Sequence, residues 1–346
     1  MNSSRLHPFA GILVLSLLCA TALASCGSSS NAVIQLVKSP APIRLTQLTP
    51  DLVRASAQTQ IQKLTVPLSH LSGDLPLGFG GESCITNPHA SSALGSRTAA
   101  CVFGDVHSKR TLELVGDSNA WMWLPTFNAI GIAEHFRVDL DSRGACEVAD
   151  LPMWDTTDHS PGTGCSQFRK YFIAKISRVR PFATVLVDYE YVTKSNYQNQ
   201  PFTTDAYDAG ITSTISRISH DGSSTVLLGT PPPQLFGGPL CLAASASTVK
   251  HCGIPAACAT IATDIASNCK FSEPGKTYAY LPGLSTAATS GGGHFVPIES
   301  LFCTTSICPA VVDDTAVFAD DVHVSEHYAT LIWPAMAQIL ARYGIS

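Results

Sequence analysis

The sequence predicts an α/β fold, a three-layer sandwich in which a central parallel sheet of about five strands lies between helices. From Thr111 onward, short β-branched or apolar runs alternate with longer stretches of helical character, which is typical of a parallel sheet. The chain has 346 residues, of which 45% are hydrophobic and 14% charged, so it is able to bury a full core.

Five short β-branched or apolar runs are predicted to be strands: residues 111–115, 136–140, 184–189, 224–229 and 294–298. Helices are expected between or after them, at residues 120–130, 166–179, 204–219, 256–267 and 328–343. This order indicates a flavodoxin-like sheet, and neither an internal repeat nor a second domain is evident. In such a sheet we expect the reactive groups at the carboxyl ends of the strands, where the connecting loops form a crevice.

Residues 1–26 are predicted to be an export signal. Arg5 and His7 precede an apolar run, residues 12–23, that is too short to span a bilayer comfortably as a helix. The run ends in Leu23-Ala24-Ser25-Cys26, which resembles the bacterial lipobox, whose cysteine receives lipid and becomes the mature N-terminus. The alternative is an ordinary signal peptide that is cut near Ala24. Acyl chains on Cys26 would hold the protein at the outer face of the bacterial cytoplasmic membrane or cell envelope.

Residues 27–50 are predicted to be a flexible tether, because they are rich in Ser, Pro and Thr and lack a helical or strand period. The folded domain is then expected to span residues 51–346. The net charge of −5 gives no basic surplus, which argues against nucleic acid as a partner.

The cysteines favour an oxidising compartment. Of 12 cysteines, Cys19 lies in the leader and Cys26 at the lipidation point, which leaves 10, an even number. Sequence neighbours would pair Cys84 with Cys101, Cys146 with Cys165, Cys241 with Cys252, Cys258 with Cys269 and Cys303 with Cys308, although sequence alone leaves the connectivity open. A zinc site would need closely spaced thiolates such as C-x-x-C, and the sequence has none. No metal or other cofactor is expected.

Ser118 lies where the first predicted strand meets a helix. The strand is followed at once by Gly116-Asp117-Ser118-Asn119, and an apolar helix begins near Ala120. A serine at this turn is able to expose its hydroxyl, while the first-turn amide and the helix dipole favour negative charge on a bound carbonyl oxygen. The alternative is that the serine merely caps the helix.

A serine hydroxyl needs a base to become a nucleophile, and usually a carboxylate to orient that base. Asp320 and His323 form a D-x-x-H spacing in one loop, just before a helix that starts near Glu326. Three residues apart within a turn, the carboxylate is able to reach one ring nitrogen and leave the other facing Ser118.

These motifs together resemble the SGNH hydrolases, specifically the SGNH domain attached to acyltransferase-3 type membrane O-acyltransferases that acetylate bacterial cell-surface polysaccharides. The resemblance spans roughly Leu48 to the C-terminus. It rests on ordered landmarks: Leu48-Thr49-Pro50, Cys84 and Cys101, Val115 to Trp121, Cys146, Leu227 to Pro232, Cys241-Leu242, Phe302-Cys303, Cys308-Pro309 and Asp320 to Ser325.

The resemblance implies roles for individual residues. Ser118 would accept the acyl group, His323 would act as general base and then acid, and Asp320 would orient the imidazolium; Asp321 is the alternative orienter. The Ser118 amide would be one oxyanion donor and Gly144, in Ser142-Arg143-Gly144-Ala145-Cys146, the second. Many family members have a donor asparagine after the third strand, whereas here that place reads Val187-Asp188-Tyr189-Glu190-Tyr191, so the third donor is unidentified.

The resemblance also implies acetyl transfer to, or ester hydrolysis on, cell-envelope carbohydrate through a Ser118 acyl-enzyme. Attached relatives receive their acyl group from a multi-span membrane module, so here we expect a separate membrane acyl donor or ready-made esters. The alternative function is a non-catalytic, glycan-binding surface lipoprotein, in which Trp121, Trp123 and Trp154 would stack on sugar rings.

Overall fold

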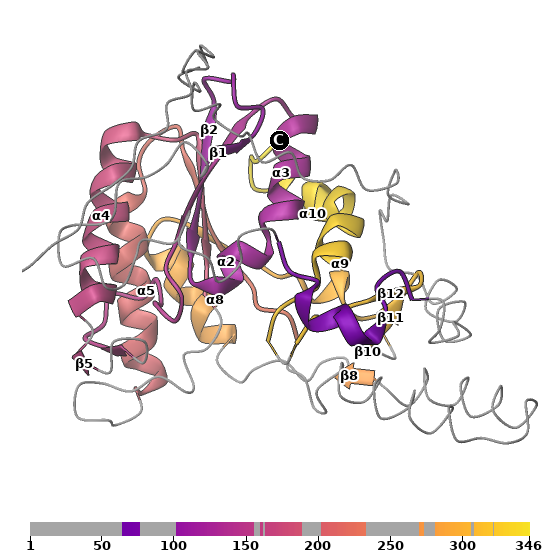
Figure 1. The fold of residues 1–346 in the computed structure, drawn as a ribbon. Helices are drawn as coiled ribbons and strands as arrows, with labels where there is room; N and C mark the ends of the chain where they lie inside the picture. Colours follow the sequence, from indigo (N-terminus) through magenta and orange to yellow (C-terminus); the bar gives the residue numbers. More distant parts are fainter. Residues whose placement is uncertain are drawn as a thin grey trace, which may run out of the picture. The chain divides into compact units, whose positions relative to one another are not determined.

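The computed structural model describes nine parts of the chain (Figure 1), all within the larger of its two compact units, Leu36–Ser346. The described residues are 64–76, 102–155, 160–161, 163–188, 202–232, 270–272, 281–305, 308–320 and 322–346. The predicted leader with Cys26, the tether, helix 256–267 and Asp321 lie outside the described residues.

A six-stranded sheet forms the centre of the fold (Figure 1), with the strand order β1-β3-β2-β6-β7-β9. Five strands run parallel, and β1 pairs antiparallel with β3 at the edge. The bounds are β1 Val102–Gly104, β2 Thr111–Gly116, β3 Arg137–Ser142, β6 Ala183–Val187, β7 Ser224–Leu228 and β9 His294–Val296. The predicted α/β fold is thus confirmed, and the five predicted strands are the parallel ones. Strand β1 was not predicted, since three half-buried residues give too short a pattern.

The strand order places a topological switch point beside β2. The chain passes from β2 to β3 on one side and then returns to add β6 on the other. This is the flavodoxin-like order, in which ligands bind outside the carboxyl ends of the strands at the switch point.

Helices cover both faces of the sheet (Figure 1), with α4, α5 and α8 on one side and α3, α9 and α10 on the other. Their bounds are α2 Ser118–Met122, α3 Leu124–Ala133, α4 Thr163–Val179, α5 Thr204–Ile218, α8 Leu281–Ser290, α9 Glu326–Leu331 and α10 Trp333–Ala341. Helices 120–130 and 328–343 were each predicted as one continuous helix, and this was wrong, because each region forms two helices. Each is broken before a proline, Pro125 and Pro334, that starts a new helix. Helix α8 was not predicted.

Short elements complete the described structure. They are the 3₁₀ helices η2 Leu68–Gly73 and η5 Glu299–Leu301, and three antiparallel pairs: β4 Trp154–Asp155 with β5 Ser160–Pro161, β8 Lys270–Ser272 with β10 Cys308–Pro309, and β11 Val311–Val312 with β12 Thr315–Ala316. None of the described helices is long and apolar enough to cross a membrane.

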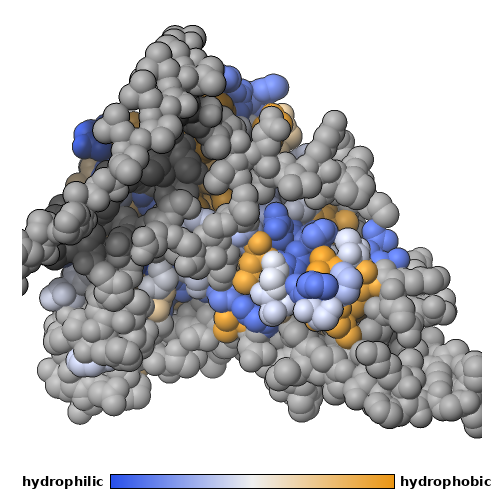
Figure 2. Space-filling model, in the orientation of Figure 1, coloured by the Kyte–Doolittle hydropathy of each residue, from blue (hydrophilic) through white to orange (hydrophobic). Residues whose placement is uncertain are grey.

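Side-chain alternation along β2 separates two apolar cores. Leu112 and Leu114 pack in the core under α3, α9 and α10, whereas Val115 packs in the core under α4, α5 and α8. The exposed large hydrophobic side chains lie in different segments: Val106 in the turn after β1, Ile132 on α3 and Val179 at the end of α4. The described surface visible in Figure 2 accordingly mixes hydrophilic and hydrophobic side chains.

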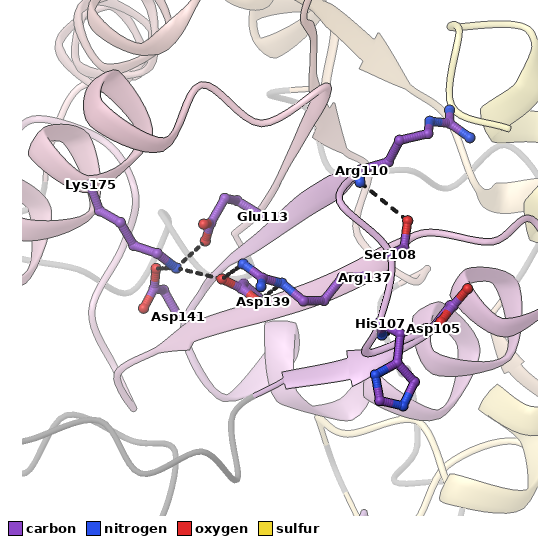
Figure 3. A network of polar contacts seen from close by, with 9 residues as sticks. All are labelled: Asp105, His107, Ser108, Arg110, Glu113, Arg137, Asp139, Asp141 and Lys175. Atoms are coloured by element: carbon purple, nitrogen blue, oxygen red, sulfur yellow. Dashed lines mark hydrogen bonds and ion pairs between the residues drawn. The ribbon is translucent and has the colours of Figure 1, made fainter.

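A buried ionic network lies between α4 and strands β2 and β3 (Figure 3). The ammonium of Lys175 on α4 contacts Glu113 of β2 at 2.5 Å, and Asp141 and Asp139 of β3 at 2.9 and 3.6 Å. Arg137 of β3 pairs with Asp139 at 3.0 Å. Isolated buried charges are costly, so these residues have to be ordered together.

Two of the predicted disulfides lie within the described residues, and both are confirmed. The bond between Cys146 and Cys165 joins the loop after β3 to the first turn of α4, with 5.2 Å between the Cα atoms. The bond between Cys303 and Cys308 closes a short loop before β10.

The other three predicted disulfides fall on cysteines outside the described residues. These pairs are Cys84 with Cys101, Cys241 with Cys252, and Cys258 with Cys269. Their pairing therefore stays a prediction from sequence spacing.

Candidate active site

Ser118 is the first residue of α2, directly beyond the carboxyl end of β2. The helix is capped by Asp117, whose Oδ1 accepts a hydrogen bond from the Asn119 amide at 2.7 Å. The alternative interpretation of Ser118 as the capping residue is therefore wrong, because the preceding residue has that role.

Gly116 allows the end of β2 to lie against the end of β6. A Cβ atom at position 116 would sit 2.2 Å from the carbonyl oxygen of Val187, which is closer than any side chain tolerates. The glycine is therefore required by close backbone approach at the switch point, and this approach fixes where the Ser118 turn begins.

His323 joins Ser118 and Asp320 into a hydrogen-bonded chain. Its Nε2 lies 2.9 Å from Ser118 Oγ, and its Nδ1 lies 2.8 Å from Asp320 Oδ2. The structure thus brings together the three predicted side chains, of which Ser118 and His323 are 205 residues apart in sequence. A base within hydrogen-bonding distance of a hydroxyl, oriented by a carboxylate, is the arrangement that nucleophilic catalysis requires.

Both carboxylate oxygens of Asp320 are engaged. Oδ2 faces the His323 ring, while Oδ1 accepts from the backbone amides of Val322 at 2.8 Å and His323 at 2.7 Å. Partial burial alone would raise the pKa of Asp320, but these hydrogen bonds and the neighbouring imidazole together lower it. Asp320 is therefore held as a carboxylate.

The loop that carries His323 is anchored on both sides of the histidine. The Ala319 amide donates to the His323 carbonyl at 2.9 Å, and the Ser325 amide donates to Val317 at 3.0 Å. The Val324 amide lies 3.3 Å from the thioether sulfur of Met122 on α2. The histidine loop therefore rests directly on the helix that begins with Ser118.

The segment after β3 is hydrogen-bonded to the Ser118 turn. The Arg143 amide donates to the Gly116 carbonyl at 3.0 Å, and the Ser142 hydroxyl donates to the Asp117 carbonyl at 2.7 Å. Sequence reasoning missed Ser142, because its place opposite Gly116 follows from the β2–β3 pairing, which the structure shows and the sequence pattern does not.

Gly144, the second predicted oxyanion donor, follows in a turn closed by a bond from the Cys146 amide to the Arg143 carbonyl at 3.1 Å. Within the described part of the chain, no atom beyond its neighbours lies within 4 Å of where a Gly144 Cβ would be. Among the described residues, nothing fills the space on that side of the glycine.

The segment after β6, where many family members have a donor asparagine, begins here with Asp188. β6 ends at Val187, and the following Asp188 is buried and accepts a hydrogen bond from the Tyr207 hydroxyl. Residues 189–191 lie outside the described residues.

Two of the three tryptophans suggested as sugar platforms are in the core. Trp121 and Trp123 are 2% and 0% exposed and pack under α3, α9 and α10. The stacking role considered for them is wrong, because both side chains are buried in this core. Trp154, in β4, is half-buried.

A Ser–His–Asp chain at the carboxyl edge of a flavodoxin-like sheet defines a class of α/β proteins that includes serine esterases and acyltransferases. Within that class, residues 83–338 match the model of the SGNH domain that is fused to AT3 domains, and the chain belongs to this family. Family membership supports an esterase-type enzyme that performs acyl transfer or ester hydrolysis in general.

The chain is similar to solved structures at low identity. The periplasmic domain of a lipopolysaccharide acetyltransferase from Salmonella ser. Paratyphi A is 13% identical, with 69% of this chain and 85% of that chain covered and a TM-score of 0.49. A GDSL-like lipase from Bacteroides thetaiotaomicron is 12% identical, with 68% and 89% covered and a TM-score of 0.37. No match is found among the curated proteins.

Proposed function

We propose that this protein transfers or hydrolyses acyl groups, acetyl above all, on cell-envelope carbohydrate through an acyl-enzyme at Ser118. The observation that carries the proposal is the continuous hydrogen-bonded chain from Ser118 Oγ through His323 to Asp320. Family membership supplies the reaction class.

The first half-reaction forms the acyl-enzyme. Ser118 Oγ gives its proton to His323 Nε2 as it bonds to the ester carbonyl carbon, and the carbonyl electron pair moves onto oxygen. Asp320 stabilises the imidazolium that results. When the carbonyl re-forms, the ester C–O bond breaks and the leaving alkoxide takes the proton from His323.

The second half-reaction releases the acyl group. An acceptor hydroxyl gives its proton to His323 and bonds to the acyl carbon, and the collapse of this intermediate returns the proton and the free hydroxyl to Ser118. A sugar hydroxyl as acceptor gives O-acylation, and water gives deacylation. The Ser118 and Gly144 amides are proposed as the donors that stabilise the oxyanion in both halves.

Carbohydrate is proposed as the substrate from the resemblance to domains attached to polysaccharide O-acyltransferases. An extracytoplasmic, lipid-anchored position agrees with the predicted leader ending at Cys26 and with the disulfides. The acyl donor would be a membrane protein in trans or a ready-made ester.

The nucleophile is tested with a fluorophosphonate probe and a chromogenic acetyl ester. We expect wild type to be labelled and to turn over the ester, and Ser118→Ala to lose labelling and about 10⁶-fold in kcat. Ser216→Ala, an exposed serine on α5, is the matched control and should behave as wild type. Wild type that is neither labelled nor active would overturn the enzymatic proposal and favour the glycan-binding alternative.

The acceptor is identified separately. Purified protein is incubated with acetylated and with unacetylated envelope glycans, while acetate release and glycan mass are followed. Acetate release from the first glycan indicates hydrolysis, whereas a mass gain of one acetyl group on the second, given an acyl donor, indicates transfer. If neither acetate release nor a mass gain is seen with any glycan, carbohydrate is not the substrate. The Ser118 chemistry is still tested independently by the ester assay.

A further inference from the structure

Ser142, the last residue of β3, has a fully buried hydroxyl next to the Ser118 turn. It is 0% exposed, and its Oγ lies 2.7 Å from the carbonyl oxygen of Asp117. Because a carbonyl oxygen only accepts, the hydroxyl is the donor. The contact therefore ties the end of one strand to the peptide that leads into Ser118.

The sheet explains why Ser142 reaches that peptide. Strand β3 is parallel to β2 with Ser142 paired to Gly116. Successive side chains in a strand point to opposite faces. Asp141 points to the α4 face, where it contacts Lys175 at 2.9 Å, so Ser142 points to the other face, where α2 begins.

The Asp117 carbonyl is held by two donors. Besides the Ser142 hydroxyl, it accepts from the Ala120 amide at 3.1 Å, and together they fill its two lone pairs. The Asp117–Ser118 peptide is planar, and in a trans peptide the carbonyl and the N–H point in opposite directions. Fixing the carbonyl of Asp117 therefore also fixes the direction of the Ser118 N–H.

We propose that Ser142 is a positioning residue that aims the Ser118 amide at the oxyanion. The inference rests on the proposed function and deepens it, because the Ser118 amide is a proposed donor in that mechanism. Ser142 acts through the peptide that precedes the nucleophile, to which its hydroxyl donates. A donor that is held in place before the reaction needs no reorganisation as charge develops, which is how oxyanion donors lower the barrier.

The change that tests this is Ser142→Ala, which removes the hydroxyl and little else. We expect kcat for the acetyl ester to fall about 10-fold, while KM stays within about 2-fold of wild type. This loss of kcat is smaller than the roughly 10²–10³-fold loss when a whole oxyanion donor is removed, because the Ala120 amide still bonds to the Asp117 carbonyl. The rate of fluorophosphonate labelling should fall in parallel. The pH midpoint of kcat/KM should not move, since the contacts of His323 and Asp320 are untouched. Ser142→Thr keeps a hydroxyl and should recover most of kcat.

Thr214→Val is the matched control. Thr214 on α5 is also fully buried, and its hydroxyl donates to the Val148 carbonyl at 2.7 Å. This contact lies on the face of the sheet that α4, α5 and α8 cover. This variant removes the same kind of bond and should keep the kcat of wild type. If Ser142→Ala does not fold, as judged by circular dichroism, Ser142→Cys has a similar volume and a weak donor and should show the same loss of kcat.

The outcomes separate the two proposals. If wild type is active and Ser142→Ala matches it, or if Thr214→Val loses as much kcat as Ser142→Ala, the positioning role is overturned and the proposed function stands. If the loss appears in KM rather than kcat, the role is overturned as well. If wild type itself is inactive and unlabelled, the proposed function fails and the role of Ser142 fails with it.

Discussion

At the scale of single residues, Asp320 has a double task, because one carboxylate oxygen faces His323 and the other holds the backbone amides of its own loop. The same hydrogen bonds that orient the imidazole also close the turn. Loss of the charge should therefore affect both the reaction and the stability of the loop.

We expect Asp320→Asn to lower kcat by about 10³–10⁴-fold, by analogy with other catalytic triads, because an amide cannot stabilise the imidazolium. The stability effect has a defined pH dependence. The pKa of Asp320 is lower in the folded protein than its ordinary value of about 3.9, so its contribution is present above that value and is lost as pH falls through the folded pKa. Unfolding in urea should show a gap between wild type and Asp320→Asn at pH 7 that closes below about pH 4.

The control for this assignment is Asp321→Ala, which should keep most of the activity. Loss of activity in Asp321→Ala as complete as in Ser118→Ala, with Asp320→Ala active, would mean that the orienting carboxylate is misassigned. A stability gap that persists unchanged at about pH 3 would contradict the role of the Asp320 charge in the loop.

Ser118, Asp320 and His323, which the structure brings together, lie in short local motifs, and this has a physical reason. The strand, the glycine and the start of the helix around Ser118 lie within a few residues of one another, so the sequence pattern predicts this turn. The D-x-x-H spacing of Asp320 and His323 is also local. Ser142 was missed because its partner is Asp117, in another strand's loop 25 residues away. Its contact depends on the register of two strands, which the pattern of either strand alone does not contain.

At the scale of secondary-structure elements, β3 illustrates how pattern and environment differ. Its apolar Val138 and Leu140 alternate with Asp139 and Asp141, which predicts a strand with one solvated face. The strand is present, but its charged face is buried under α4, where Lys175 contacts Asp141 and Asp139, and Arg137 also pairs with Asp139 (Figure 3). The sequence therefore predicts the element but not the layer above it.

Lys175→Met should destabilise the protein by about 3–5 kcal/mol, because it leaves buried carboxylates without their cation. The free energy of urea unfolding measures this. Lys170→Met, on the exposed face of the same helix, is the matched control and should stay within about 0.5 kcal/mol of wild type. Equal stabilities of the two variants would show that the network contributes nothing beyond a surface charge.

At the scale of the whole molecule, distant segments are joined by single polar contacts. Asp74, after η2, is buried and contacts the imidazole of His327 on α9 at 2.6 Å, and its carbonyl accepts from the Glu326 amide at 2.8 Å. The hydrogen bond that His327 donates to Asp74 raises the pKa of His327. Burial lowers that pKa, whereas the charges of Asp74 and Glu326 raise it further. No local pattern predicts a pair that is 253 residues apart.

We expect His327→Gln to destabilise the protein more at pH 6 than at pH 9. The contribution of a histidine whose folded pKa is raised is complete below its unfolded pKa of about 6.5 and is lost as pH rises through the folded pKa. The free energy of urea unfolding of wild type and of His327→Gln is compared at the two pH values. Glu326 is unchanged in both proteins. A gap that is as large at pH 9 as at pH 6 would contradict a charged His327.

The separation of Ser118 from His323 by 205 residues also has a consequence for the order of events during synthesis. Because a chain is synthesised from its N-terminus, the serine turn is made long before the histidine loop. Closing so long a loop also costs chain entropy before any contact compensates for it. We therefore expect the hydroxyl to stay unreactive in nascent chains and truncated fragments, and reactivity to appear only when α9 and the loop before it have docked onto α2.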